Sequence, residues 1–470
     1  MNFNSPEFLI FLPVVLVLHG LLSGGPERRR HGLLLAASYL FYMSWNWRYA
    51  GLIAFSTLVD FQLGRAMAAS TDEARRKLLL ITSLSTNLGL LALFKYFNFF
   101  SDSVESVFER FGVDLALPHH ELLLPVGISF YTFQTLSYTI DLYWRRIEVE
   151  HNLTRFALFV SFFPQLVAGP IVRASEFLPQ LAEPRRVRAD QVQLGIARIF
   201  RGLAKKILIA DLLAASLVDP VFADPAAHSS VDLALGLYAY AFQIYGDFSG
   251  YSDIAIGAAL CLGYVLPDNF NRPYLSQNVR EFWTRWHITL SSWLRDYLYI
   301  PLGGNRGSAL RTRVNLMLTM LLGGLWHGAA ANFIAWGAYH GALLMFARGA
   351  DRRAGQVATS GARVWARRLV CFHLVLFGWL LFRVESLSDL GPYLSNLFAF
   401  SGESQAHPMA IALLGAAAVA HIVPRDLLDR LQRRLAGDVP AALQGALYAA
   451  AIVLFTGASL DTAAFIYFQF

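Results

Sequence analysis

Charged side chains are scarce in this chain: they make up 15% of its 470 residues, while hydrophobic residues make up 56%. Soluble globular domains carry about 25% charged residues. The shortage of charge excludes a large soluble domain, so most of the chain is expected to be surrounded by lipid.

Cysteine is almost absent, and the motifs of several enzyme classes are missing. The two cysteines, Cys261 and Cys371, lie in apolar stretches and are expected to pack as small hydrophobic residues rather than to form a disulfide or a metal pair. The chain contains no zinc-ligand spacing, no glycine-rich phosphate loop and no GxSxG elbow. We predict no metal site, and the remaining classes are acyl transfer in the membrane, transport, and a non-catalytic scaffold.

What the chain does contain is a series of long hydrophobic runs along its whole length, for example at residues 8–22, 122–140, 314–325 and 441–458. Because roughly 20 apolar residues cross a bilayer as a helix, the pattern predicts an all-α polytopic membrane protein with about 10 to 12 transmembrane helices, plus re-entrant and interfacial helices. We expect one membrane domain over residues 1–470, with scaffold spans in 1–150, a motif-rich catalytic core in 151–350 and carboxyl-terminal spans in 351–470.

The net charge of +6 predicts topology rather than a nucleic-acid partner. Basic clusters lie between the apolar runs, at residues 28–30, 75–77, 185–188, 363–368 and 425–434, and such clusters face the cytoplasm. The acidic stretch 101–121, which includes Glu121, is expected to face outward. Residues 2–6 lack the basic start of a signal peptide, so no cleavable one is expected. Counting spans between the basic clusters predicts an amino terminus outside and residues 28–30 inside.

Two segments of the middle region carry unusual polar features. Residues 162–170 place two prolines and a glycine in an apolar run, and such a run forms either a kinked span or the wall of a cavity. Residues 191–215 are amphipathic and basic, with Arg198, Arg201, Lys205 and Lys206. That segment either lies in the plane of the interface or offers charge to an anionic cytosolic ligand.

Two further segments concentrate aromatic and charged residues. Residues 238–264 contain Asp247, Tyr251 and Asp253 in an aromatic span, and we favour a polar tunnel lining over a buried structural network. Residues 280–300 place Trp283, Trp286, Leu290, Leu294 and Tyr297 on one helical face, which predicts a helix lying at the membrane surface. His287 in that helix is expected to pack or to contact headgroups.

Two histidines, His327 and His340, lie thirteen residues apart in a stretch with almost no charge. A titratable ring in apolar surroundings is costly and usually has a purpose, and an imidazole can act as a general base near neutral pH. On one continuous helix the two rings would lie roughly 140° apart. Either the helix breaks near residues 328–332, or the two histidines do different jobs.

A series of ordered strings resembles the membrane-bound O-acyltransferases. These strings are DFSGYSD at 247–253, NFNRPY at 269–274, EFW at 281–283, RWH at 285–287, WLRDY at 293–297, GGNRG at 303–307 and GLWHG at 324–328. They resemble most the bacterial branch that contains the alginate O-acetyltransferase membrane subunit and the D-alanine transfer protein of teichoic acids, with the stronger resemblance to the alginate side of that branch. The resemblance covers nearly the whole chain, since residues 124–133 and 467–470 match as well.

The resemblance implies a fold in which spans surround a thin centre pierced by a tunnel. It assigns the catalytic histidine to His327 and the second family histidine to His340. Donor acetyl-CoA would enter from the cytosol of a bacterium, with no bound cofactor, and acetyl would leave on the outer side of the inner membrane. Separate periplasmic SGNH-type partners would complete the transfer to an exopolysaccharide.

The remaining candidate residues follow from the same motifs. Asp247, Tyr251 and Asp253 would line the tunnel, and Trp286, Arg285 and Arg295 would shape the cytosolic entry. The other substrate or tunnel candidates are Asn269, Asn271, His287 and Trp326. Alginate is the favoured polymer, with cellulose or another exopolysaccharide as the alternative. A transporter of an acetyl carrier and a docking scaffold are the other functions considered, although we find no internal inverted repeats.

Overall fold

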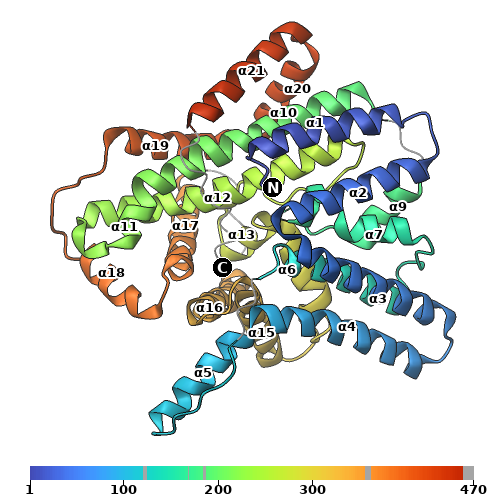
Figure 1. Ribbon diagram of the computed structural model, residues 1–470. Coiled ribbons are helices and arrows are strands. Elements are labelled where there is room, and N and C mark those ends of the chain that lie inside the picture. The colour runs from blue at the N-terminus through green and yellow to red at the C-terminus, as the bar shows by residue number, and fades with distance from the viewer. Residues whose placement is uncertain (120–123, 168, 184–186, 355–360, 459–470) are drawn as a thin grey trace. The chain divides into compact units, whose positions relative to one another are not determined.

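The computed structural model describes residues 1–119, 124–167, 169–183, 187–354 and 361–458 (Figure 1). These residues form helices and turns, and none of them lies in a strand. The all-α prediction is therefore confirmed for the described part of the chain. Arg185 and Arg186 of the predicted basic cluster, Glu121 of the acidic stretch and the matching string at 467–470 lie outside it.

The chain divides into two compact units, one formed by residues 1–192 and 258–266 and the other by residues 193–257 and 267–470. The expected single domain with boundaries at residues 150 and 350 stays a prediction. The first unit contains α1 (Pro6–Leu21), α2 (Glu27–Asn46), η1 (Trp47–Tyr49), α3 (Ala50–Ala69), α4 (Glu73–Lys95), α5 (Phe97–Arg110), α6 (Ile128–Tyr143), α7 (Leu153–Ser161), α8 (Phe163–Leu166), α9 (Ala174–Ala182) and the start of α10 (Ala189–Leu203).

The second unit holds the histidine-rich segments. Its elements are η2 (Ala204–Asp211), η3 (Ala214–Val218), α11 (Asp219–Ala223), η4 (Pro225–Ala227), α12 (Ser230–Cys261), η5 (Pro273–Leu275), α13 (Val279–Arg285), α14 (Ile288–Leu294), η6 (Arg295–Tyr299), α15 (Ala309–His327), α16 (Ala331–Ala354), α17 (Ala362–Arg383), η7 (Leu387–Asp389), α18 (Leu390–Leu397), α19 (Pro408–Ile422), α20 (Arg425–Gly437) and α21 (Ala441–Ala458). Of these, η2, η3 and η6 are π-helical, a form that is often found at functional sites.

Among the described residues, two helices are long and apolar enough to cross a bilayer by themselves, α4 and α17. Shorter apolar helices occur at Pro6–Leu21, Leu153–Leu166, Pro408–Ile422 and Ala442–Ala458. The expected total of 10 to 12 spans therefore stays a prediction.

The prediction of one continuous surface helix over residues 280–300 is wrong. α13 ends at Arg285 and α14 begins at Ile288, because His287 adopts a left-handed backbone with φ of 41°. Asn269 holds this corner: its carbonyl accepts the N–H of Ile288, and its side-chain oxygen accepts the hydroxyl and N–H of Thr289. Trp286 is 1% exposed, so the corner is buried rather than spread on a surface.

Glycines let α10 and α12 cross at very short range. A Cβ added at Gly202 would lie 2.5 Å from the carbonyl oxygen of Gly250, and one at Gly257 would lie 2.6 Å from that of Gly195. Small residues at helix crossings allow close backbone approach in membrane proteins. This crossing places the basic face of α10 and η2 against the acidic residues of α12.

Candidate active site

The helix carrying the two histidines breaks between them. α15 ends at His327 and α16 begins at Ala331, and a Cβ added at Gly328 would lie 2.1 Å from the ring of Phe333. The break brings both histidines against one indole: the ring of Trp336 lies 5.0 Å from that of His327 and 4.9 Å from that of His340. Of the two arrangements that the spacing allows, the structure has the broken helix.

His327 lines a cavity of about 720 Å³ and is itself only 5% exposed. The cavity is lined by residues from α13, α14, η6, α15 and α16, among them Arg280, Trp283, Arg295 and Trp336. We call it the histidine cavity. Its size is in the range of small-molecule sites, and it offers an imidazole in otherwise largely apolar surroundings.

His340 lies outside that lining and is completely buried. Its ring is stacked on Phe282 at 6.3 Å and meets the edge of Trp283 at 5.2 Å. Neither of its ring nitrogens has a hydrogen-bond partner among the described residues. Gly378 of α17 makes room for the ring, because a Cβ there would lie 2.5 Å from Nε2 of His340.

His287 connects this region to a second cavity. Its Nδ1 shares a 3.0 Å hydrogen bond with the side-chain oxygen of Asn269, and its ring meets the ring of Phe248 edge-on at 4.6 Å. On its other side the ring of Trp326 lies 6.2 Å away, and Trp326 is itself 5.0 Å from His327. His287 and Trp326 thus lie between Asn269 and the catalytic candidate.

The second cavity has a volume of about 340 Å³. It is lined by α10, η2, α12, the segment from Asn269 to Arg272, and α19 and α20; Asp253, Asn269 and Asn271 are the sequence-predicted residues in its wall. We call it the cationic cavity, because Arg198, Arg201, Lys205 and Arg272 also line it.

Asp253 is the anchor of the cationic cavity. Its carboxylate accepts hydrogen bonds from Arg198 at 3.0 Å, Arg201 at 2.9 Å and Lys205 at 2.7 Å. Arg198 also pairs with Asp268. The side chains of the three cations are 18% to 24% exposed, so they are held at the cavity and do not extend into solvent.

Asp247, the other acidic residue of the same motif, lies elsewhere. Its carboxylate is 2.8 Å from the Nζ of Lys206, which also reaches Asp211 at 2.8 Å. Asp247 and Lys206 are each 2% exposed. Asp247 and the similarly buried Tyr251 are absent from the lining of either cavity. A tunnel role for them stays a prediction.

Of the remaining candidates, one lines a cavity and two make other contacts. Arg295 lines the histidine cavity and pairs with Asp296 at 2.6 Å. Arg285 pairs with Glu281 at 2.6 Å and donates to the carbonyl of Asn271. Trp286 packs against Trp379 at 4.7 Å and Phe270 at 5.1 Å. These contacts bring the motif residues into one unit.

The sequence profile of the membrane-bound O-acyltransferase family matches residues 145–381 of the chain, and the broken helix with His327 lies inside this match. The chain belongs to the membrane-bound O-acyltransferase family. It is therefore a membrane protein and an O-acyltransferase, which confirms the resemblance and the predicted enzyme class.

Individual relatives within this O-acyltransferase family act on different polymers by name. The chain is 45% identical to the probable alginate O-acetylase AlgI of Pseudomonas aeruginosa, over 85% of this chain and 75% of that protein. It is 36% identical to the peptidoglycan O-acetyltransferase of Helicobacter pylori, over 86% and 81% of the two chains. It is 29% identical to the teichoic acid D-alanyltransferase of Bacillus subtilis, over 56% and 70%.

Some residues of this O-acyltransferase site escaped the sequence reasoning. Trp336 lies four positions before His340, on the same helical face, so the spacing could have indicated it. His421 lines the cationic cavity. His421 lies in the last turn of α19, far from every motif, and only the occurrence of a histidine in an apolar run could have indicated it.

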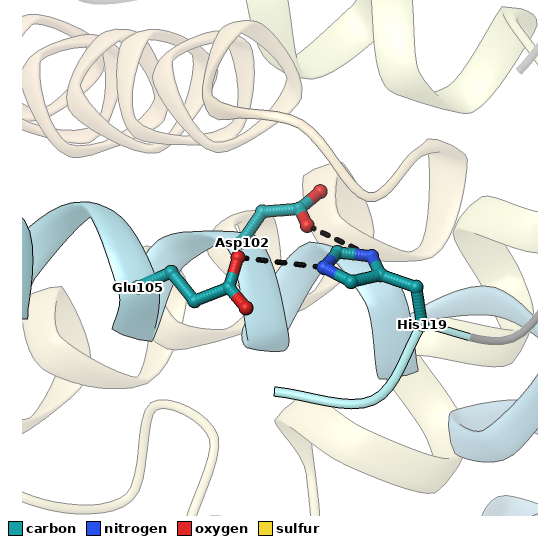
Figure 2. A group of neighbouring side chains, drawn as sticks. All are labelled: Asp102, Glu105 and His119. Atoms are coloured by element: carbon teal, nitrogen blue, oxygen red, sulfur yellow. Dashed lines mark hydrogen bonds and ion pairs between the residues drawn. The ribbon is translucent and has the colours of Figure 1, made fainter. Parts of the chain in front are cut away.

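A separate group of side chains lies in the first unit, on α5 and the segment after it (Figure 2). The ring nitrogens of His119 lie 3.3 Å from Asp102 and 3.4 Å from Glu105. A hydrogen bond from the backbone N–H of Leu117 holds the pKa of Glu105 below its ordinary value. The three ligand atoms lie within 4.8 Å of one another, as a metal ion would require. However, the contacts of His119 with the two carboxylates account for the cluster equally well, and the predicted lack of a metal site stays a prediction.

Proposed function

We propose that this O-acyltransferase transfers acetyl from acetyl-CoA at the cytosolic side of a bacterial inner membrane toward an acceptor at the outer side, for the O-acetylation of an exopolysaccharide. Alginate is the favoured polymer, because several curated relatives at 42% to 45% identity are named for alginate. The observation that carries the proposal is His327 at the wall of the histidine cavity, inside the family match.

In this mechanism His327 takes the proton of the acceptor hydroxyl through a ring nitrogen. The hydroxyl oxygen attacks the thioester carbonyl, a C–O bond forms and the C–S bond breaks. The proton then passes from the imidazole to the departing thiolate, so that the products are an acetyl ester and free thiol. The mechanism needs no covalent acetyl-enzyme, and both cysteines are buried.

The negative oxygen of the tetrahedral intermediate needs hydrogen-bond donors. Trp283 and Trp336 both line the histidine cavity, and neither indole N–H has an acceptor among the described residues. Donors already held in place stabilise such an oxyanion without reorganisation. We assign this role to Trp336, whose ring is 5.0 Å from that of His327.

The surroundings of the protein follow from the same proposal. It would cross the inner membrane several times, with its basic clusters in the cytoplasm. Periplasmic SGNH-type proteins would receive the acetyl group and pass it to the polymer, because the sequence contains no large soluble domain for that step.

The first test is acetyl release from radiolabelled acetyl-CoA by the purified chain in detergent. Turnover is expected in the wild type and in His151→Ala, which changes an exposed histidine. It should be lost in His327→Ala, with the same yield and melting temperature. Full activity of His327→Ala would refute the assignment of the base. Transport of an acetyl carrier into liposomes without any acyl transfer would instead support the transporter.

A further inference from the structure

We propose that the cationic cavity binds the phosphate groups and the pantetheine arm of the acyl donor, so that Arg198, Arg201 and Lys205 select a coenzyme A thioester. The inference rests on the proposed function, and it names the part of the donor that the protein recognises away from the reacting carbonyl. The sequence left open whether this basic segment lies at the interface or meets an anionic ligand. The cavity geometry favours the ligand.

The side chains around the cavity carry a net positive charge. Arg198, Arg201, Lys205 and Arg272 line it, and Asp253 is the carboxylate among its described lining residues. Asp268 compensates part of the charge of Arg198 from outside the lining. The four cations therefore exceed the two carboxylates by two charges. In these partly buried surroundings, charge-assisted hydrogen bonds to phosphate are strong.

Two buried polar groups in the wall of the cavity have no hydrogen-bond partner among the described residues. The hydroxyl of Ser249 and the Nδ1 of His421 make no hydrogen bond with any residue that the structure describes, and the two side chains are 2% and 6% exposed. Nε2 of His421 accepts the N–H of Tyr274, so the neutral ring carries its proton on Nδ1 and offers a donor. A buried polar group without a partner is costly.

These two groups match the pantetheine arm better than they match a hydrocarbon chain. The rest of the wall is largely apolar, with Phe242, Tyr245 and Phe270 among its residues. The arm of coenzyme A carries two amides along a flexible chain, which would use the hydroxyl and the imidazole. A phospholipid could place its phosphate on the arginines, but its acyl chains would leave both groups without partners.

A series of contacting side chains links the wall of the cavity to His327. Asn269 lines it and bonds to His287, and the ring of His287 faces Trp326, which is next to His327. At the other end, Leu428 of α20 lines the cavity, and α20 belongs to a basic cluster expected in the cytoplasm. A donor bound by its phosphates at the cationic end would thus direct its thioester toward the catalytic histidine.

The experiment measures the KM for acetyl-CoA and the Kd for coenzyme A with the full chain in detergent. The Kd is measured on a His327→Ala background, so that catalysis does not interfere. The variants are Arg201→Gln, Lys205→Gln and the charge-retaining Arg201→Lys. Each neutral variant leaves Asp253 with two other cationic partners, which favours folding. The control is Arg188→Gln, an exposed arginine paired with Asp190 outside both cavities.

We expect each neutral variant to raise both constants at least about tenfold, because a tenfold change is about 1.4 kcal/mol and a hydrogen bond to a charged group contributes about that much or more. The kcat should change little, and Arg201→Lys should recover most of the loss. Dephospho-coenzyme A should bind the wild type more weakly than coenzyme A does, and this difference should shrink in the neutral variants. Arg188→Gln should behave as the wild type.

The outcomes separate this proposal from the proposed function. If the wild type turns over and the neutral variants keep its KM, the donor site is refuted while the function stands. If the wild type does not turn over but binds coenzyme A through Arg201, the site is supported and the function fails for the isolated chain. If only nanodiscs containing phosphatidylglycerol raise the melting temperature, and do so through Arg201, the cavity is a lipid site and the proposal is overturned.

Discussion

The residues of the proposed site differ in where they lie. His327 lines the histidine cavity, while His340 is enclosed by Phe282, Trp283 and Trp336 and reaches neither cavity lining. Trp336 contacts both histidines. Substitutions that preserve ring shape can therefore remove one chemical function at a time.

Trp336→Phe tests the oxyanion donor. The substitution keeps an aromatic ring beside His327 and removes the indole N–H, and loss of one such donor lowers kcat by about 10²- to 10³-fold. Steady-state kinetics should show this fall with little change in KM. Trp365→Phe changes an exposed tryptophan and should have no effect. Wild-type kcat in Trp336→Phe would remove this residue from the mechanism.

His340→Phe distinguishes support from simple packing. Both ring nitrogens lack partners among the described residues, and replacing an unsatisfied buried polar group by an apolar one of similar shape is close to neutral or stabilising. We expect the melting temperature to stay the same or rise. If His340 supports catalysis, kcat should fall clearly below the wild-type value. If the variant is both stable and fully active, His340 has only a packing role.

From the sequence alone, residues could be singled out where a side chain is chemically out of place. His327 and His340 stand out because imidazoles are rare in apolar stretches, and the family strings add their roles. The sequence did not indicate that Asp247 pairs with Lys206 while Asp253 pairs with three other cations. Those partners depend on which faces of α10, η2 and α12 meet, and that is decided by packing between helices.

At the scale of elements, helix breaks position the site more than helix faces do. The break after α15 places His327 against Trp336, and the corner at His287 separates α13 from α14. The first break was one of two arrangements that the spacing allowed. The second was missed because the apolar residues of 280–300 keep helical spacing across it, and Asn269, which holds the corner, is distant in sequence.

The crossing of α10 with α12 gives a prediction for these elements. In Gly202→Ala the new methyl group would meet the carbonyl oxygen of Gly250 at 2.5 Å, so the helices must separate. Overpacking of this kind costs about 1–3 kcal/mol. Thermal unfolding in detergent should show the loss, and the KM for acetyl-CoA should rise because Arg198 and Arg201 move with α10.

A matched substitution controls for the change in helix propensity. Gly445→Ala introduces the same methyl group in α21, where nothing lies within 4 Å of the new Cβ. It should leave both the melting temperature and the KM near wild type. Equal behaviour of the two variants would mean that the crossing tolerates more separation than its geometry indicates.

For the whole molecule, the arrangement in the membrane can be tested with introduced cysteines. Thr71→Cys lies beside the basic residues 75–77 and Asp114→Cys lies in the acidic stretch, with α4 between them. A membrane-impermeant maleimide should label Asp114→Cys in intact spheroplasts and Thr71→Cys only after permeabilisation. The native cysteines are 1% and 3% exposed, so background labelling should be low. The reverse pattern would invert the proposed direction of acetyl transfer.

The indole rings around the histidines have a spectroscopic consequence. Five of the ten tryptophans, Trp283, Trp286, Trp326, Trp336 and Trp379, lie in the connected cluster of rings around His327 and His340. Tryptophan fluorescence responds to polarity and to nearby quenching groups. A ligand that enters the histidine cavity should therefore change the emission wavelength and the intensity of the intrinsic fluorescence. The enzyme would thus report occupancy of its reaction centre without any added dye.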